Sequence, residues 1–263
     1  MALQLSEIWI YPVKSLGGIR LKEAKVLEKG LQWDRRYMLM DRTGRFMTQR
    51  EHHRMSQFHT EWHNEGFLIR YQREFRLLPF EPTTEDTVSA QVWDDSLYVR
   101  KVKGDYHDWF SVHLGTACEL VFFPESNERR VDPRYAADET HVSLADGYPF
   151  LVVGQASLDD LNARLDQPVP MNRFRPNLVF TGGQPFEEDT WQNFTIGSNR
   201  FRGVKPCARC VLTTIDQETS LAGKEPLRTL AAYRTREHKV YFGQNAIAID
   251  HEKISEGDVV EVG

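Results

Sequence analysis

Two cysteines three positions apart carry the clearest chemical signal in the sequence. Cys207 and Cys210 lie in the run Lys205-Pro206-Cys207-Ala208-Arg209-Cys210. A thiolate is a nucleophile and a ligand for soft metals, and the flanking cations Lys205 and Arg209 favour its charged form. The pair therefore indicates a metal-thiolate or redox site. Spacing alone leaves an alternative open, in which the cysteines are small buried hydrophobic residues beside a solvated arginine.

The number of cysteines narrows these interpretations. The sequence holds 3 cysteines, the third being Cys118, which is too few for a disulfide framework or a four-cysteine zinc site. A thioredoxin-type pair begins a helix, whereas the β-branched residues at 211–215 predict a strand after Cys210. We therefore expect the pair in a short connection between two strands. A zinc-binding or thiol-redox module stays as the weakest hypothesis.

Two further stretches hold residue types that bind anions. Residues 171–180 set two arginines and two asparagines just before a predicted buried strand. Arginine binds phosphate through two parallel hydrogen bonds, and asparagine both donates and accepts. Residues 11–18 combine Lys14 and Ser15 with two glycines, which allow backbone amides to approach a ligand. Neither stretch has the Walker pattern, so nucleotide hydrolysis is not supported.

Charge and hydropathy exclude two classes of partner. The 263 residues include 33 Lys and Arg against 38 Asp and Glu, a net charge of −5, which argues against a general nucleic-acid binder. The longest apolar runs, such as residues 150–153, are strand-length and far short of the roughly 18 residues that cross a bilayer, so no membrane partner is expected. The first residues lack a basic, then apolar, signal segment, which favours the cytoplasm.

The elements that must position these side chains are mostly strands. Strands are predicted at residues 5–13, 37–40, 46–48, 91–93, 97–102, 119–123, 149–153, 177–181, 194–196, 201–204, 211–215, 240–242, 246–249 and 259–262. Helices are predicted from Asp105 to Gly115, behind a capping-box-like start at Ser157, and from Pro226. Strands and helices do not alternate regularly, so the fold class is α+β, predominantly β, rather than a doubly wound sheet. The polar run at 124–139 divides the chain into domains of residues 1–123 and 124–263.

Six stretches together carry a resemblance to a known family. They are Tyr11-Pro12-Val13-Lys14-Ser15, Asp34-Arg35, Ala145-Asp146-Gly147-Tyr148-Pro149, Phe174-Arg175-Pro176-Asn177, Lys205-Pro206-Cys207-Ala208-Arg209-Cys210 and Phe242-Gly243-Gln244-Asn245. In this order, and over nearly the whole chain, they resemble the MOSC-domain family, in particular its YcbX-type bacterial members and the mitochondrial amidoxime reducing component. The resemblance implies a MOSC-associated β-barrel domain at 1–123 and a MOSC-type mixed β-barrel domain with a few helices at 124–263.

The resemblance also implies a cofactor and the residues that hold it. Relatives carry a molybdenum cofactor (molybdopterin), and the matching position makes Cys210 the catalytic residue and the protein's ligand to molybdenum. Residues matched to the pterin and phosphate contacts of the relatives are Lys14, Ser15, Arg35, Arg175 and Asn177. Ala208, through its backbone, and Phe242 fall where relatives also contact the cofactor. Cys207 is expected to be structural rather than a ligand.

The reaction implied is the reduction of N-hydroxylated small molecules: hydroxylaminopurines, amidoximes and hydroxamic acids. Many bacterial relatives carry a further [2Fe–2S] domain, but 3 cysteines cannot supply four cluster ligands and the molybdenum thiolate. We therefore expect no iron–sulfur cluster in this chain and a separate reductase or ferredoxin as electron donor. The alternative is a non-enzymatic carrier of sulfur or of molybdenum cofactor that uses Cys207 and Cys210.

Overall fold

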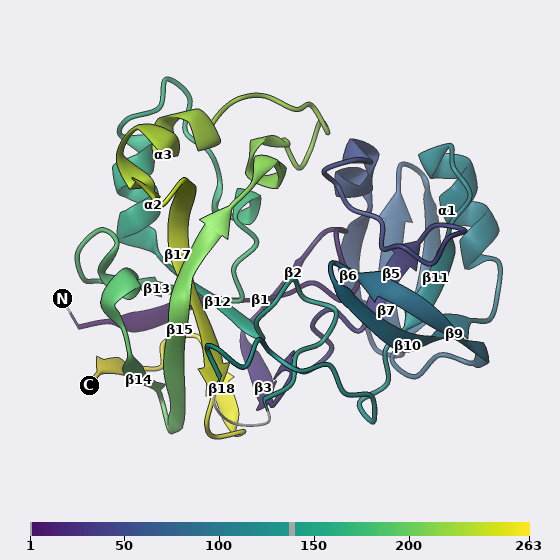
Figure 1. Ribbon diagram of the computed structural model, residues 1–263, viewed down its shortest axis with the longest axis horizontal. Helices are drawn as coiled ribbons and strands as arrows, with labels where there is room; N and C mark the ends of the chain where they lie inside the picture. The colour runs from purple at the N-terminus through teal and green to yellow at the C-terminus, as the bar shows by residue number, and fades with distance from the viewer. Residues whose placement is uncertain (1, 137–139) are drawn as a thin grey trace.

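Two β-rich lobes lie side by side in the computed structural model, which describes residues 2–136 and 140–263 (Figure 1). The lobe at the left of Figure 1 carries the largest sheet and two helices. The lobe at the right carries one helix and two smaller sheets. This arrangement confirms a predominantly β, α+β fold. None of the described helices is long and apolar enough to cross a membrane.

The left lobe is built on a nine-stranded mixed sheet. Over the described residues its order is β19-β14-β15-β17-β12-β13-β1-β2, with β16 paired to β17. The bounds are β1 (Gln4–Ile10), β2 (Ile19–Leu21), β12 (Phe150–Gly154), β13 (Leu178–Thr181), β14 (Asn193–Ile196), β15 (Asn199–Arg209), β16 (Thr235–Arg236), β17 (Lys239–Ala248) and β19 (Val260–Val262). Strands β12 and β13 pair in parallel, whereas β1 joins β13 antiparallel.

The right lobe holds two antiparallel sheets. One runs β5-β11-β10-β9 and the other β6-β7-β8. The bounds are β5 (Tyr37–Met40), β6 (His59–His63), β7 (Gly66–Tyr71), β8 (Glu74–Pro79), β9 (Thr84–Val92), β10 (Asp95–Val102) and β11 (Glu119–Phe122).

A further small sheet, β18-β3-β4, joins β3 (Glu23–Leu27) and β4 (Gly30–Leu31) to β18 (Lys253–Ser255) near the C-terminus. The sequence patterns predicted β5, β10 and β11 but missed β3, β4, β6, β7, β8 and β18.

Helices cover the sheets at few places. The α-helices of the described residues are α1 (Tyr106–Leu114), α2 (Gln155–Asn162) and α3 (Leu227–Arg234). Short 3₁₀ segments are η1 (His53–Gln57), η2 (Met171–Arg173), η3 (Glu187–Thr190) and η4 (Val211–Thr214). Helix α1 ends as predicted at Gly115, whose left-handed φ of 72° suits glycine. The predicted start of α2 at Ser157 is wrong, because Ser157 is buried inside the helix and donates to Glu188.

Three strand predictions near the cysteines are corrected by the structure. Residues 211–215 do not form a strand: Thr213 and Thr214 bond back to the carbonyls of Cys210 and Val211, which closes η4. Strand β15 extends through Cys207, so the pair does not lie in a short connection between strands. The two strands predicted at 240–242 and 246–249 are one strand, β17.

N-terminal segments complete sheets of the C-terminal half. Gln4 of β1 lies opposite Thr181, and Lys25 of β3 lies opposite Lys253. The largest hydrophobic cluster accordingly draws on both halves, from Ile8 and Phe58 to Phe180. The domain boundary placed between residues 123 and 124 stays a prediction.

Candidate functional site

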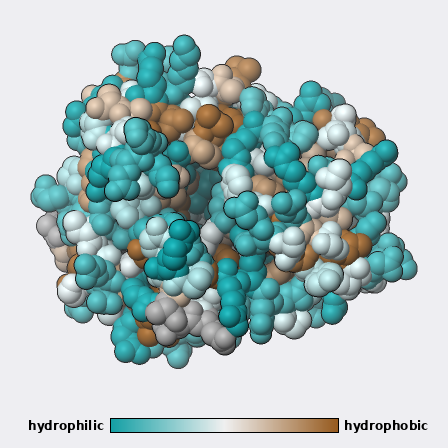
Figure 2. Space-filling model, in the orientation of Figure 1, coloured by the Kyte–Doolittle hydropathy of each residue, from teal (hydrophilic) through white to brown (hydrophobic). Residues whose placement is uncertain are grey.

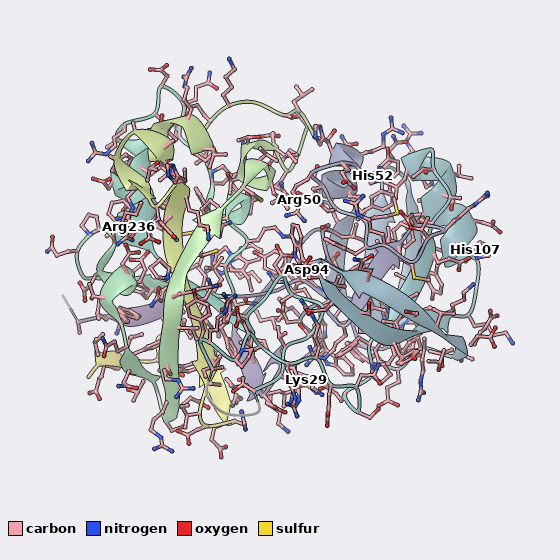
Figure 3. All side chains as sticks on the ribbon, viewed as in Figure 1. Lys29, Arg50, His52, Asp94, His107 and Arg236 are labelled. Atoms are coloured by element: carbon pink, nitrogen blue, oxygen red, sulfur yellow. The ribbon has the colours of Figure 1, made fainter. Side chains whose placement is uncertain are left out.

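A cavity between the two lobes gathers most of the residues singled out in the sequence. Seven of them line it: Lys14, Ser15, Arg35, Arg175, Asn177, Ala208 and Cys210. Figure 2 shows the surface hollowed between the lobes, and Figure 3 places Arg50, another lining residue, at the same junction. Their proximity in space is a finding, whereas their individual roles stay predictions.

Three of the lining residues hold a backbone conformation that side chains rarely adopt. Ser15, Arg35 and Arg175 have φ angles of 67°, 50° and 55°. Only a few per cent of non-glycine residues occupy this left-handed region, and such conformations concentrate at functional sites. Each of the three turns sharply at the cavity wall, which explains how short loops present Ser15, Arg35 and Arg175 to one space.

The floor of the cavity is a stack of two arginines on a tyrosine. The guanidinium carbons of Arg35 and Arg175 each lie 4.2 Å from the centre of the Tyr11 ring. Asp34 accepts from Arg35 Nη1 at 2.5 Å, and Arg175 Nη1 donates to the Leu16 carbonyl at 2.8 Å. Burial lowers the pKa of Arg175 to about 10 and raises the pKa of Tyr11 to about 12. The charge of Arg175, whose hydrogen bond goes to a neutral carbonyl, is therefore poorly solvated and available to an anion, whereas Asp34 balances the charge of Arg35.

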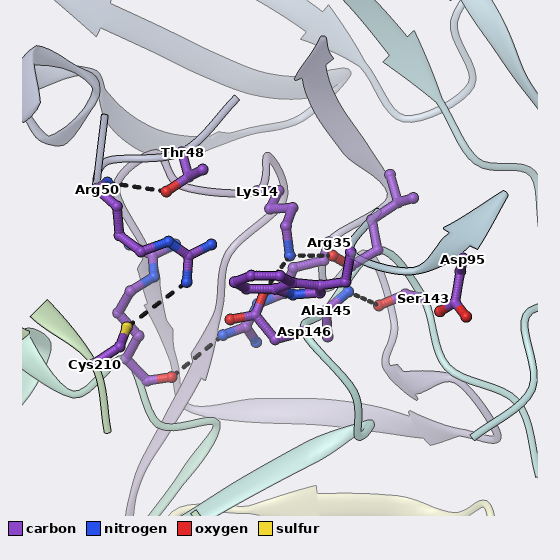
Figure 4. A network of polar contacts seen from close by, with 12 residues as sticks. Lys14, Arg35, Thr48, Arg50, Asp95, Ser143, Ala145, Asp146 and Cys210 are labelled. Atoms are coloured by element: carbon purple, nitrogen blue, oxygen red, sulfur yellow. Dashed lines mark hydrogen bonds and ion pairs between the residues drawn. The ribbon is translucent and has the colours of Figure 1, made fainter. Parts of the chain in front are cut away.

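An ion pair closes the side of the cavity nearest the right lobe. Lys14 Nζ donates to Asp146 Oδ1 at 2.5 Å and to the Leu144 carbonyl at 2.7 Å (Figure 4). Burial lowers the pKa of Lys14 to about 8, against the opposing effect of Asp146. Burial raises the pKa of Asp146, but Lys14, Arg50 and Trp93 together hold the pKa of the carboxyl well below its usual range. The buried Arg129 anchors the same loop by donating to the carbonyls of Ser143, at 2.9 Å, and Ala145.

The two cysteines occupy different environments at the opposite wall. Cys210 is exposed and follows the last residue of β15, whereas Cys207 is half-buried inside that strand. Arg209 donates to Cys207 Sγ at 3.1 Å and to the Phe174 carbonyl at 2.7 Å, which ties the strand to the floor. Arg50 Nη1 lies 3.7 Å from Cys210 Sγ. Cys210 is thus the more accessible of the two thiols of the pair.

The remaining predicted residues differ in how they meet the cavity. Phe242 is fully buried and does not line the wall; its ring stacks behind Phe174 with centroids 4.1 Å apart. Both side-chain groups of Asn177 bond to backbone, to Trp9 O at 3.2 Å and Leu151 N at 3.3 Å. Ala208 pairs with Tyr241 of β17, so its strand position is fixed by the sheet.

Arg50 is one lining residue that sequence reasoning did not single out. It lies 160 positions from Cys210 in the sequence, and the run Thr48-Gln49-Arg50 has no pattern that indicates a ligand site. A structure is needed to place it beside a thiol of the other lobe.

Two family models of known proteins match this chain. Residues 2–117 match the family model of the MOSC N-terminal beta barrel domain, and residues 139–261 match that of the MOSC domain. The mitochondrial amidoxime-reducing component 1 of Mus musculus is 32% identical over 88% of this chain and 71% of its own length. The chain belongs to the MOSC-domain family. The component 1 of Homo sapiens is likewise 32% identical to this MOSC-domain protein, over 97% of the chain and 82% of its own length.

Another relative of this MOSC-domain protein has a different name. The molybdenum cofactor sulfurase of Arabidopsis thaliana is 30% identical over 91% of the chain, which spans 32% of that relative's length. The same two-domain segment is therefore shared with proteins that are about three times as long.

The side chains of this MOSC-domain protein fit an anionic ligand that carries a soft metal. Five cations line the cavity, Lys14, Arg35, Arg50, Arg175 and Arg209, against the carboxylate of Asp146. No group of three or more His, Cys, Asp or Glu side chains among the described residues could hold a metal ion. A metal that arrives bound to a phosphorylated organic ligand can take a protein thiolate as a further ligand, and the exposed Cys210 offers one.

Proposed function

We propose that this protein is a molybdenum-cofactor-dependent oxidoreductase that reduces N-hydroxylated small molecules such as amidoximes, hydroxamic acids and hydroxylaminopurines. The observation that carries the proposal is the pairing, in one cavity, of an exposed thiol with a poorly solvated cationic floor. Relatives named amidoxime-reducing components, at 32% identity over most of the chain, support the choice of reaction.

The residues of this chain divide the work of holding the cofactor. Cys210 would ligate molybdenum, since its sulfur is accessible and belongs to a fixed strand end. Lys14, Arg35 and Arg175 would bind the phosphate, because cations in a desolvated wall favour a dianion strongly. Ser15, in its left-handed turn, presents a hydroxyl and backbone amide to the same space.

When bound, the cofactor supplies a metal that accepts oxygen and cycles between two oxidation states. Reduction of an N–OH group consumes two electrons and two protons and releases water. Lys14, with a pKa of about 8, and its partner Asp146 can hold a proton at Nζ beside the cavity near neutral pH. The electrons would come from a separate reductase or ferredoxin in the cytoplasm.

The test measures metal and turnover together. Wild type, Cys210→Ser and Cys207→Ser are purified from a host that makes molybdenum cofactor, then assayed for molybdenum, for pterin and for reduction of benzamidoxime with reduced methyl viologen as donor. We expect near-stoichiometric molybdenum and turnover in wild type, loss of both in Cys210→Ser, and retention of most molybdenum in Cys207→Ser.

Two results would reject the proposal. Wild type without molybdenum and pterin would remove the cofactor assignment. Molybdenum with no turnover, together with a persulfide that transfers from Cys207 or Cys210 to another protein, would favour the carrier function instead.

A further inference from the structure

Arg50 reaches the cavity from the right lobe and is held there by an aromatic ring. Its guanidinium carbon lies 4.2 Å from the centre of the Trp93 ring and 5.9 Å from that of Phe46. Its backbone N–H donates to Thr48 Oγ1 at 2.9 Å (Figure 4). When a planar guanidinium stacks on an indole, its N–H groups point outward in the plane of the guanidinium and stay free to donate hydrogen bonds.

The ring that holds Arg50 is itself fixed in place. Trp93 has a φ of 57°, in the left-handed region that is unusual for so bulky a residue. Its Nε1 donates to Asp146 Oδ1 at 3.2 Å, and its ring packs on Phe46 with centroids 5.2 Å apart. The indole therefore connects Arg50 to the Lys14–Asp146 pair. Trp93 occupies a left-handed turn in which a small polar residue would be less strained.

Arg50 has an unusual set of partners for a cation. None of the described carboxylates lies within ion-pair distance of it, whereas the neighbouring Arg45 pairs with Glu51 at 2.6 Å. The contact that its Nη1 makes is to Cys210 Sγ, at 3.7 Å. The backbone of Cys210 is already fixed, since its carbonyl accepts from Thr213 Oγ1 at 3.0 Å. Arg50 Nη1 is thus placed to donate to the sulfur of Cys210.

The residue next to Arg50 fixes the separation of the two lobes at this point. Gln49 and Gln217 exchange two amide hydrogen bonds, of 3.1 and 3.0 Å. Gln49 Nε2 also donates to the Ser15 carbonyl at 2.8 Å. This reciprocal pair holds the segment that carries Arg50 against the loop that follows Cys210, so the two residues start from neighbouring backbone positions.

We propose that Arg50 is a positioning residue for the sulfur of Cys210: stacked on Trp93, it presents a guanidinium N–H across the cleft and fixes the sulfur at the cavity wall. This role of Arg50 extends the proposed function. Only its effect on the bound metal rests on that function. If Cys210 ligates molybdenum, loss of the Arg50 donor lowers the midpoint potential of the metal, because N–H groups that donate to a ligating sulfur withdraw electron density from it.

The experiment uses the cofactor-free protein, so that it does not depend on the proposed function. Alkylation of Cys210 by iodoacetate, an anion, and by iodoacetamide, a neutral reagent of similar size, is followed by peptide mass spectrometry at pH 7 and low ionic strength. The ratio of the two rate constants reports the charge beside the sulfur, whereas a change in fold or exposure alters both rates alike. The variants are Arg50→Gln, Trp93→Asn and, as a matched control from the same loop, Arg45→Gln.

We expect the iodoacetate-to-iodoacetamide ratio to fall about threefold or more in Arg50→Gln, and less at 0.5 M salt, where charges are screened. Trp93→Asn tolerates the left-handed turn and keeps the arginine, yet should also lower the ratio because the guanidinium is released. Arg45→Gln should leave it unchanged. An unchanged ratio in Arg50→Gln, or an equal fall in Arg45→Gln, overturns the assignment of Arg50 even if the protein proves to be a molybdenum enzyme.

Discussion

Arg35 donates through Nη2 to the backbone carbonyl of Arg175 at 3.2 Å. One cation of the cavity floor therefore holds the left-handed turn that carries the other, although they lie 140 positions apart in the sequence. Because both guanidinium groups also pack on Tyr11, removing either should disturb the anion site as a unit rather than subtract one charge.

Inorganic phosphate should stabilise the cofactor-free protein through this floor. At a phosphate concentration about tenfold above the dissociation constant, a ligand that binds the folded state adds about 1.4 kcal/mol to the free energy of unfolding. We expect a phosphate-dependent rise in Tm for wild type that is lost in Arg175→Met. Arg200→Met is the control, since Arg200 is exposed and paired with Asp250; an equal loss in Arg200→Met would contradict a site at the floor.

Stability should depend on Lys14 in the alkaline range. The folded pKa of about 8 lies below the ordinary value of 10.5, so between these pH values the unfolded chain keeps a proton that the folded chain has released. The free energy of unfolding therefore rises with pH across this window, by at most about 3 kcal/mol. Urea unfolding at pH 7.5 to 10.5 should show a smaller rise in Lys14→Met than in wild type. Parallel curves for the two proteins would reject the lowered pKa.

Arg173 should control the loop that follows the cysteine pair. This buried arginine donates to the carbonyls of Thr213, at 2.9 Å, and Glu225, at 3.3 Å. Losing a buried donor of this kind costs about 1–3 kcal/mol, so Arg173→Met should speed trypsin cleavage after Lys224 by on the order of tenfold. The control Arg228→Met removes an exposed partner of Glu225 and should change this cleavage little.

Phe242 should matter through packing. It stacks behind Phe174, so Phe242→Ala should lower the free energy of unfolding by about 3–5 kcal/mol, and Phe242→Leu by less than about 1.5 kcal/mol. Urea denaturation measures both. Phe75→Ala, at a half-exposed position, should cost no more than about 0.5 kcal/mol, and a comparable loss there would remove the contrast.

Local patterns and the family resemblance predicted those cavity residues that belong to short, continuous sequence motifs. Lys14 and Ser15 follow a strand, Arg175 and Asn177 precede one, and each motif can be read within a few residues of sequence. The resemblance then predicted that these motifs meet around Cys210, and the structure brings them together.

Contacts between segments that are far apart in the chain could not be predicted from the sequence. Arg50 faces Cys210 because the right lobe docks on the loop after β15, and no periodicity encodes that docking. The strand predicted at 211–215 failed for a related reason: β-branched propensity is weak, and two threonine hydroxyls bonding back to carbonyls outweighed it.

The pairing of β1 with β13 sets an order of events during synthesis. A ribosome that adds about 5–20 residues per second releases β1 roughly 10–35 s before its partner Leu178–Thr181 exists. Strand β3 waits longer still, for Lys253–Ser255. Meanwhile the sheets of the right lobe, whose strands all lie between residues 37 and 122, can close on their own. The sheets of the right lobe can thus form before the early segments on their N-terminal side are paired, and β3 is completed after β1 although both are made first.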